Sequence, residues 1–125
     1  MTDMSNPQDL PDLAISVRGL SKSYKGSTRK RPALDAIDLD IPRGSFFGLL
    51  GPNGAGESTF INILAGLVLK SSGTAAIWGA DIDSDTRRAR SAIGVVPQEL
   101  NIDPFFTARE ALDFQAGMYG VPRAE

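Results

Sequence analysis

A glycine-rich string directly after a short apolar run restricts the fold of this chain more than any other feature. Residues 45–50 (SFFGLL) are almost continuously apolar, which predicts a strand buried on both faces, as in a parallel sheet. Residues 51–59 (GPNGAGEST) follow at once, and apolar residues then recur at helical spacing as far as Leu67. A buried strand, a glycine-rich turn and a helix in this order predict an α/β fold.

The glycine-rich string has the spacing of a phosphate loop, G-x-x-x-x-G-K-[ST]. Gly51, Gly56 and Ser58 match this pattern, and Glu57 stands where the lysine is expected. Glycines let the backbone approach an anion, successive N–H groups form a nest, and the following helix contributes its positive end. Ser58 is also the expected Mg²⁺ ligand. We therefore expect the loop to bind nucleotide phosphates through Gly51, Asn53, Gly54, Ala55, Gly56, Glu57, Ser58 and Thr59.

Glu57 reverses the charge at one position of that site, because an anion stands where the motif has a cation. One pair of unit charges 4 Å apart is worth about 4 kcal/mol at an effective dielectric of 20. Lost attraction and added repulsion therefore predict weakened phosphate binding, although the backbone nest remains. Glu57 has two ways to reduce this cost, since it can turn to solvent or take up Mg²⁺.

Other elements are predicted from local patterns. Residues 1–12 carry three Asp and little apolar content, which predicts a disordered tail. Residues 25–31 (KGSTRKR) predict a solvated basic hairpin loop, with a phosphate role as the alternative. The remaining predictions are strands at 13–20, 33–41, 73–79 and 93–96, a short helix within 81–90, and a helix from the capping box of Thr107 and Glu110 to about Tyr119. The strand at 33–41 alternates apolar and acidic residues, as a half-exposed antiparallel strand does. In the helix after the glycine-rich loop, the apolar residues Phe60, Ile63, Leu64 and Leu67 are predicted to belong to the core.

Composition excludes several classes of function. The chain of 125 residues has no Cys and no His, so thiol and imidazole chemistry are absent. Its 13 basic and 15 acidic residues give a net charge of −2, and we expect no nucleic-acid partner. No apolar run approaches the roughly 20 residues of a membrane span, and no signal peptide is expected.

At LLGPNGAGEST the chain resembles the ATPases of ATP-binding cassette (ABC) transporters, whose loop commonly reads GPNGAGKST. Tyr24 stands at the position of the family's adenine-stacking aromatic residue, and Gln98, in GVVPQE, at that of the Q-loop glutamine. Residues 101–122 resemble the helical region of ABC-2-type exporter cassettes. The resemblance implies that residues 13–125 are the N-terminal part of a nucleotide-binding domain, with a helical subdomain starting over 105–120. Phe105 and Phe106 either line the groove for the membrane domain or pack in a core.

The resemblance further implies ATP and Mg²⁺ as ligands, the metal being held by Ser58 and Gln98. It implies two partners, a membrane-spanning transporter subunit and a second cassette in a dimer. It places the protein in the cytoplasm, on the inner face of the cell membrane. The expected fold is thus a phosphate-loop NTPase of ABC type, truncated to an antiparallel β portion and the start of the parallel core.

Several family motifs are missing from these residues. There is no LSGGQ-like signature, no apolar run ending in Asp-Glu and no switch histidine. Phosphoryl transfer needs a positioned water, a base and charge neutralisation, so we expect no independent ATP hydrolysis. A non-catalytic interaction module and a decayed product stay open as alternatives to an exporter subunit. An RNA-binding phosphate-loop protein is disfavoured by the near-neutral charge.

Overall fold

A computed structural model describes residues 6, 8–28, 30–51, 56–99 and 103–123 of the chain. The chain divides into two compact units, Met1–Gly94 and Val95–Glu125. In the described residues, no helix is long and apolar enough to cross a lipid bilayer.

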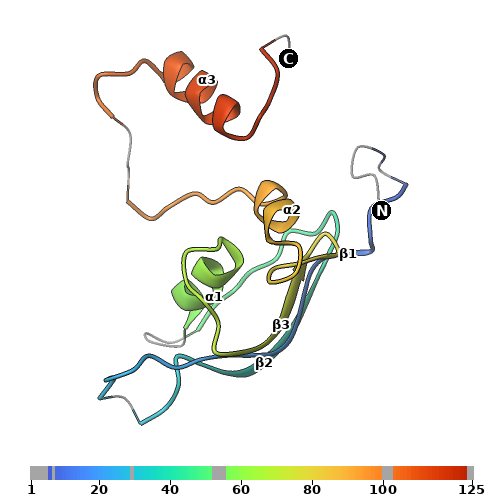
Figure 1. Ribbon diagram of the computed structural model, residues 1–125, viewed down its shortest axis with the longest axis vertical. Coiled ribbons are helices and arrows are strands. Elements are labelled where there is room, and N and C mark those ends of the chain that lie inside the picture. The colour runs from blue at the N-terminus through green and yellow to red at the C-terminus, as the bar shows by residue number, and fades with distance from the viewer. Residues whose placement is uncertain (1–5, 7, 29, 52–55, 100–102, 124–125) are drawn as a thin grey trace. The chain divides into compact units, whose positions relative to one another are not determined.

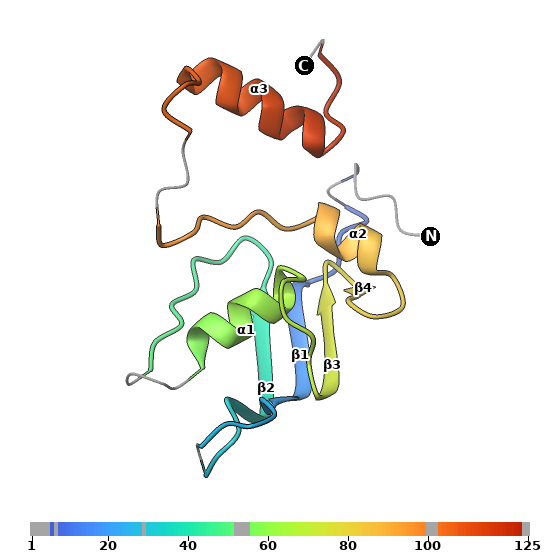
Figure 2. The same cartoon turned by 60° about the vertical axis from the view of Figure 1, so that its left-hand side comes forward.

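The first unit is built on a four-stranded sheet with the order β2-β1-β3-β4. Its strands are β1 (Leu13–Lys22), β2 (Leu34–Pro42), β3 (Ser72–Ile77) and β4 (Ala80–Asp81). Every pairing in this sheet is antiparallel. Figure 2 shows β1 between β2 and β3, which is the arrangement that the strand pairings define.

The alternation in β2 has the effect predicted from the sequence. Leu34 is buried and Ile37, Leu39 and Ile41 are half-buried, whereas the aspartates between them are exposed. On the exposed face, Arg18 of β1 donates two hydrogen bonds of 2.7 and 2.8 Å to the carboxylate of Asp40 in β2. This two-point contact holds the pKa of Asp40 below its ordinary value. The sheet therefore has an apolar face and a charged face.

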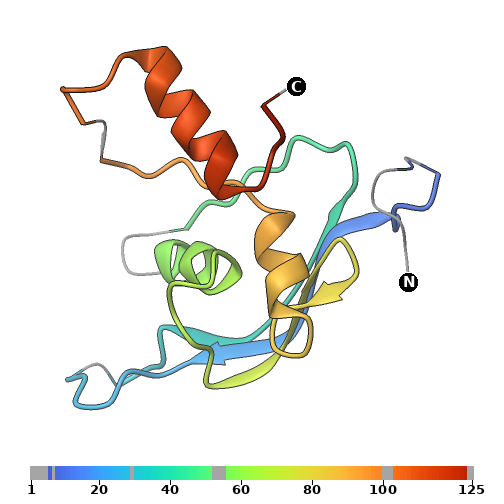
Figure 3. The ribbon, with the colours of Figure 1, turned by 45° about the horizontal axis from the view of Figure 1, so that its top comes forward.

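Two helices of the first unit, α1 (Glu57–Leu64) and α2 (Thr86–Ser91), lie over the apolar face of the sheet (Figures 1 and 3). Phe60, Ile63 and Leu64 of α1 are buried, as the helical spacing predicted. They join the buried residues of the sheet and of α2 in one cluster. The cluster consists of Val17, Leu20, Leu34, Phe60, Ile63, Leu64, Ala75, Ile77, Ala80 and Ala89.

Three sequence predictions for the core are wrong. Residues 45–50 and 93–96 form no strands, so the parallel part of the core is absent from the described residues. A central strand needs hydrogen-bonded neighbours on both edges, and none of the four strands pairs with either segment. Phe46 is fully exposed as a result. Leu67 is 73% exposed, because α1 ends at Leu64 and Gly66 adopts a φ of 77°, which breaks the helical spacing.

The second unit contains one helix, α3 (Ala108–Met118), among its described residues. The predicted capping box is confirmed. The Glu110 N–H donates to the Thr107 hydroxyl over 3.3 Å, and the Thr107 N–H donates to the Glu110 carboxylate over 2.8 Å. Gly120, with a φ of 75°, follows the helix as its predicted stop. Phe105, Leu112 and Phe114 are exposed within this unit, and none of its helix residues is buried.

Candidate nucleotide site

The glycine-rich loop runs into the start of α1, as its motif predicted. Gly51 is exposed, and the predicted ligands Asn53, Gly54 and Ala55 lie outside the described residues. Gly56 is the N-cap of α1, with a φ of 94° that a residue with a side chain rarely adopts. Its carbonyl accepts the Phe60 N–H over 2.9 Å, which is the first hydrogen bond of the helix.

Glu57, Ser58 and Thr59 form the first turn of α1. Glu57 and Thr59 are half-buried, and Ser58 is exposed. The N-cap residue Gly56 has no side chain, so it provides no side-chain acceptor for the first backbone N–H groups of α1. Among the described residues, no lysine or arginine forms an ion pair with Glu57. The first turn therefore offers hydroxyl and amide donors, which attract anions, together with one carboxylate, which repels them.

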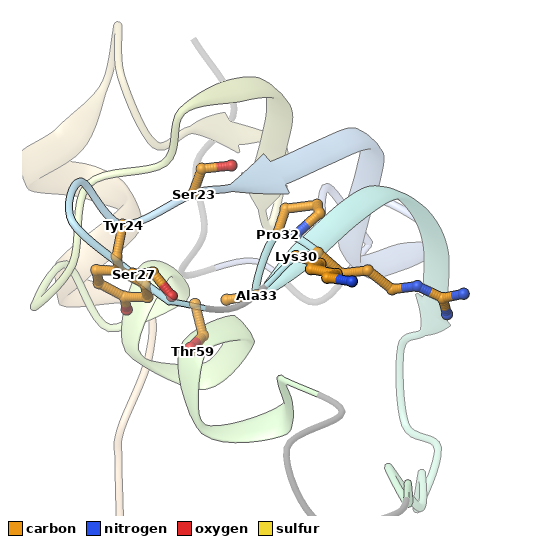
Figure 4. A pocket seen from close by; sticks show the side chains of 8 residues that line it. Ser23, Tyr24, Ser27, Lys30, Pro32, Ala33 and Thr59 are labelled. Carbon is orange, nitrogen blue, oxygen red and sulfur yellow. The ribbon is translucent and has the colours of Figure 1, made fainter.

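An open cavity of about 440 Å³ lies beside this turn, and it joins two residues that the sequence predicted for one site (Figure 4). Tyr24 comes from the loop after β1, and Thr59 comes from the first turn of α1. The ring of Tyr24 lies 4.8 Å from the Lys22 ammonium, a cation–π contact, and the residue is still 48% exposed. An aromatic ring and a phosphate-loop hydroxyl thus line one hollow.

The rest of the lining comes from the loop between β1 and β2, whose sequence predicts a solvated basic hairpin loop. The loop closes where the Ala33 N–H donates to the Lys22 carbonyl over 2.8 Å. Closure there turns the loop toward the start of α1. The additional lining residues are Ser23, Ser27, Lys30, Arg31, Pro32 and Ala33. The basic string KGSTRKR was the available signal, but only the packing shows which helix the loop meets.

Gln98 belongs to the second unit, where it is exposed at a bend. Its role as a magnesium ligand beside Ser58 stays a prediction. Within the described part of the chain, no group of three or more carboxylate side chains could hold a metal ion by itself. A nucleotide fits the chemistry of the cavity, which has an aromatic ring, hydroxyls and two cations. Glu57 brings a carboxylate to the first turn of α1, beside this cavity.

The antiparallel sheet, the helices on one of its faces and the glycine-rich loop at the start of α1 define an ATP-binding cassette fold. The chain is similar to a solved ATP-binding subunit of an ABC transporter, with a TM-score of 0.76 and 27% identity. That match covers 89% of this chain and 45% of the solved one. It is also similar to the cassette MJ0796, whose structure was solved as a dimer in a post-hydrolysis state with ADP and Pi. This match has a TM-score of 0.71 and 28% identity, and it covers 87% of this chain and 48% of the solved one.

The model of the ABC transporter family matches residues 34–123, so the chain belongs to this family. It is 41% identical to the Nod factor export ATP-binding protein I of Ralstonia nicotianae, over 88% of this chain and 33% of that protein. It is 40% identical to the linearmycin resistance ATP-binding protein LnrL of Bacillus subtilis, over 84% of this chain and 34% of that protein. It is 39% identical to the daunorubicin/doxorubicin resistance ATP-binding protein DrrA of Streptomyces peucetius, over 88% of this chain and 32% of that protein. The chain spans about a third of the length of these relatives.

Proposed function

We propose that this chain is the N-terminal part of the ATP-binding subunit of an ABC exporter, and that it binds ATP without hydrolysing it alone. The observation that carries the proposal is the cavity shared by Tyr24 and Thr59. These residues lie 35 positions apart in the sequence and on different elements. An aromatic ring such as that of Tyr24 suits an adenine, and the start of a helix, where Thr59 lies, suits a phosphate chain.

In this proposal each group of the site has one task. The partly exposed Tyr24 stacks on the base through its ring, and backbone N–H groups of residues 51–59 surround the phosphates. Ser58 holds Mg²⁺, with Gln98 as a second ligand, and the metal would neutralise phosphate charge. Glu57 lowers the affinity, because its carboxylate stands in the first turn of α1 where the phosphate-loop pattern has a lysine.

The partners are proposed on the same family basis. A membrane-spanning transporter subunit and a second cassette would complete the assembly, with the chain in the cytoplasm at the inner face of the membrane. The names of the relatives support export, and MJ0796 supports pairing, since its solved structure is dimeric. No nucleic-acid partner is proposed.

Calorimetry of the 125-residue chain with Mg²⁺-ATP tests the proposal. We expect binding that Tyr24→Ala weakens at least fivefold and that Tyr24→Phe retains, because phenylalanine keeps the stacking ring. Phosphate release should stay at the level of a protein-free blank. Equal affinity in Tyr24→Ala and the unchanged chain would contradict the adenine site, and ATP turnover would contradict the non-hydrolytic role.

A non-catalytic interaction module is the second candidate. It is favoured by Glu57, which forms no ion pair with a described lysine or arginine. Such a module would dock on a membrane domain or another cassette with no need for nucleotide. Its signature is association with a full-length cassette that is the same with and without ATP. Association that requires ATP would favour the nucleotide-binding subunit.

A further inference from the structure

Two basic side chains meet the nucleotide cavity from a loop that lies outside the phosphate-loop motif. Lys30 and Arg31 belong to the connection between β1 and β2, and both line the hollow that Thr59 lines from α1. Figure 4 shows Lys30 with Tyr24, Ser27 and Thr59 around this hollow. The loop and α1 belong to the same compact unit. The contact between the basic loop and the start of α1 is thus part of the fold of that unit.

The charges around the cavity are one-sided. Among the described residues, its lining contains two cations and no carboxylate. Within the described residues, neither Lys30 nor Arg31 forms an ion pair, whereas Lys70, Arg18 and Arg88 each contact an aspartate. Lys22 is engaged differently, over the ring of Tyr24. Lys30 and Arg31 therefore keep their charge available to a ligand in the hollow.

The phosphate loop lacks the cation that its motif supplies. Glu57 occupies the lysine position, in the first turn of α1 and two residues before Thr59. A triphosphate beside this turn carries several negative charges and meets a carboxylate where a lysine would otherwise stand. Long basic side chains on a neighbouring loop can restore the charge balance, because their flexible stems extend the ammonium or guanidinium toward the anion.

We propose that Lys30 and Arg31 supply the cationic contact to the nucleotide's phosphates that the phosphate loop lacks at Glu57. The inference deepens the proposed function and rests on it. It assigns part of the phosphate recognition to the β1–β2 loop. It also predicts that ATP affinity depends on salt through two side chains far from the motif in sequence.

The test compares ATP with adenosine, which has the base and ribose but no phosphate. Calorimetry is carried out on the full chain and on the double variant Lys30→Gln/Arg31→Gln. We expect the double variant to lose at least tenfold in Mg²⁺-ATP affinity and to bind adenosine unchanged. Its ATP affinity should also change less when the salt concentration is raised from about 50 to about 300 mM, a range over which the screening of exposed charges increases.

Two further variants serve as controls. Lys25→Gln/Arg87→Gln removes the same charge from exposed positions outside the cavity, and it should change ATP affinity less than twofold. The exchange Lys30→Arg/Arg31→Lys keeps both charges and should retain ATP binding. In the Glu57→Lys background, the loss caused by Lys30→Gln/Arg31→Gln should shrink, because the motif then supplies its own cation.

The outcomes separate this inference from the proposed function. If the unchanged chain binds ATP and the double variant binds it within twofold, the inference is wrong and the proposed function stands. If adenosine affinity falls as far as ATP affinity, the two residues shape the loop and the charge contact is wrong. If the unchanged chain binds neither ATP nor adenosine, the proposed function and the inference fail together.

Discussion

Gly56 approaches the backbone of Ala33 so closely that a Cβ at position 56 would overlap the Ala33 carbonyl oxygen. The same Cβ would lie 2.8 Å from Leu34 Cδ2, at the start of β2. Gly56 is the last glycine of the phosphate-loop motif, and Ala33 lines the cavity beside α1. The motif's glycine therefore has a second task, because it lets α1 pack against the end of the basic loop.

Gly56→Ala should destabilise the first unit by about 2–3 kcal/mol, the sum of a strained positive φ and a backbone overlap. Gly44→Ala is the matched control, since Gly44 has a φ of 69° and a Cβ added there would have no described atom within 4 Å. It should cost about 1 kcal/mol. Urea unfolding followed by circular dichroism measures both. Equal losses in the two variants would show that the close approach to Ala33 has no energetic weight.

Glu57→Lys should move ligand affinity and stability in opposite directions. ATP affinity should rise at least tenfold, because a lysine restores the phosphate-loop cation. Stability should fall by about 0.3–1 kcal/mol, because a cation replaces an anion in the first turn of α1. Calorimetry and thermal unfolding give the two values. The control Glu57→Gln should have an ATP affinity between those of the unchanged chain and Glu57→Lys. Equal ATP affinity in the unchanged chain and Glu57→Lys would contradict the charge argument.

The capping box of α3 predicts a dependence on pH. Hydrogen bonds from the backbone N–H and the hydroxyl of Thr107 hold the pKa of Glu110 below its ordinary value. Since the folded pKa is the lower one, this stabilisation is complete above the ordinary pKa of a glutamate. It is lost as the pH falls through the folded value.

Thr107→Ala should raise the pKa of Glu110 toward its ordinary value and cost the helix about 1 kcal/mol through loss of the N-cap. A titration followed by the NMR shift of the Glu110 carboxyl carbon measures the first effect, and amide exchange in α3 measures the second. Thr107→Ser keeps the hydroxyl and should change neither. The same titration midpoint in Thr107→Ala and the unchanged chain would contradict the box.

Truncation of two leucines to alanine should have very different effects on stability. Leu20 of β1 is fully buried in the core cluster, so Leu20→Ala should cost about 2–5 kcal/mol. Leu67 is 73% exposed, so Leu67→Ala should change stability by less than about 0.5 kcal/mol. Paired urea curves decide the point. A loss of several kcal/mol in Leu67→Ala would restore its predicted place in the core.

Much of the antiparallel part of the fold was predictable, because its signals are local. The acidic-apolar alternation of β2, the apolar spacing of α1 and the capping box of α3 each act over a few residues. The candidate site was predictable only in part. The spacing of the glycines indicated a phosphate loop, and the order of Tyr24 and Gln98 around it indicated a family, but no local pattern shows which side chains share a cavity.

Local sequence patterns account for the periodic strands and helices, the start of α1 at the glycine-rich loop and the anion at Glu57. The other features depend on packing between residues that are distant in sequence. Residues 45–50 are apolar enough for a buried strand, yet they form none, since a central strand requires hydrogen-bonded partners on both edges. Lys30 and Arg31 are two charges in an ordinary basic string until the closure of the β1–β2 loop brings them to the cavity beside α1.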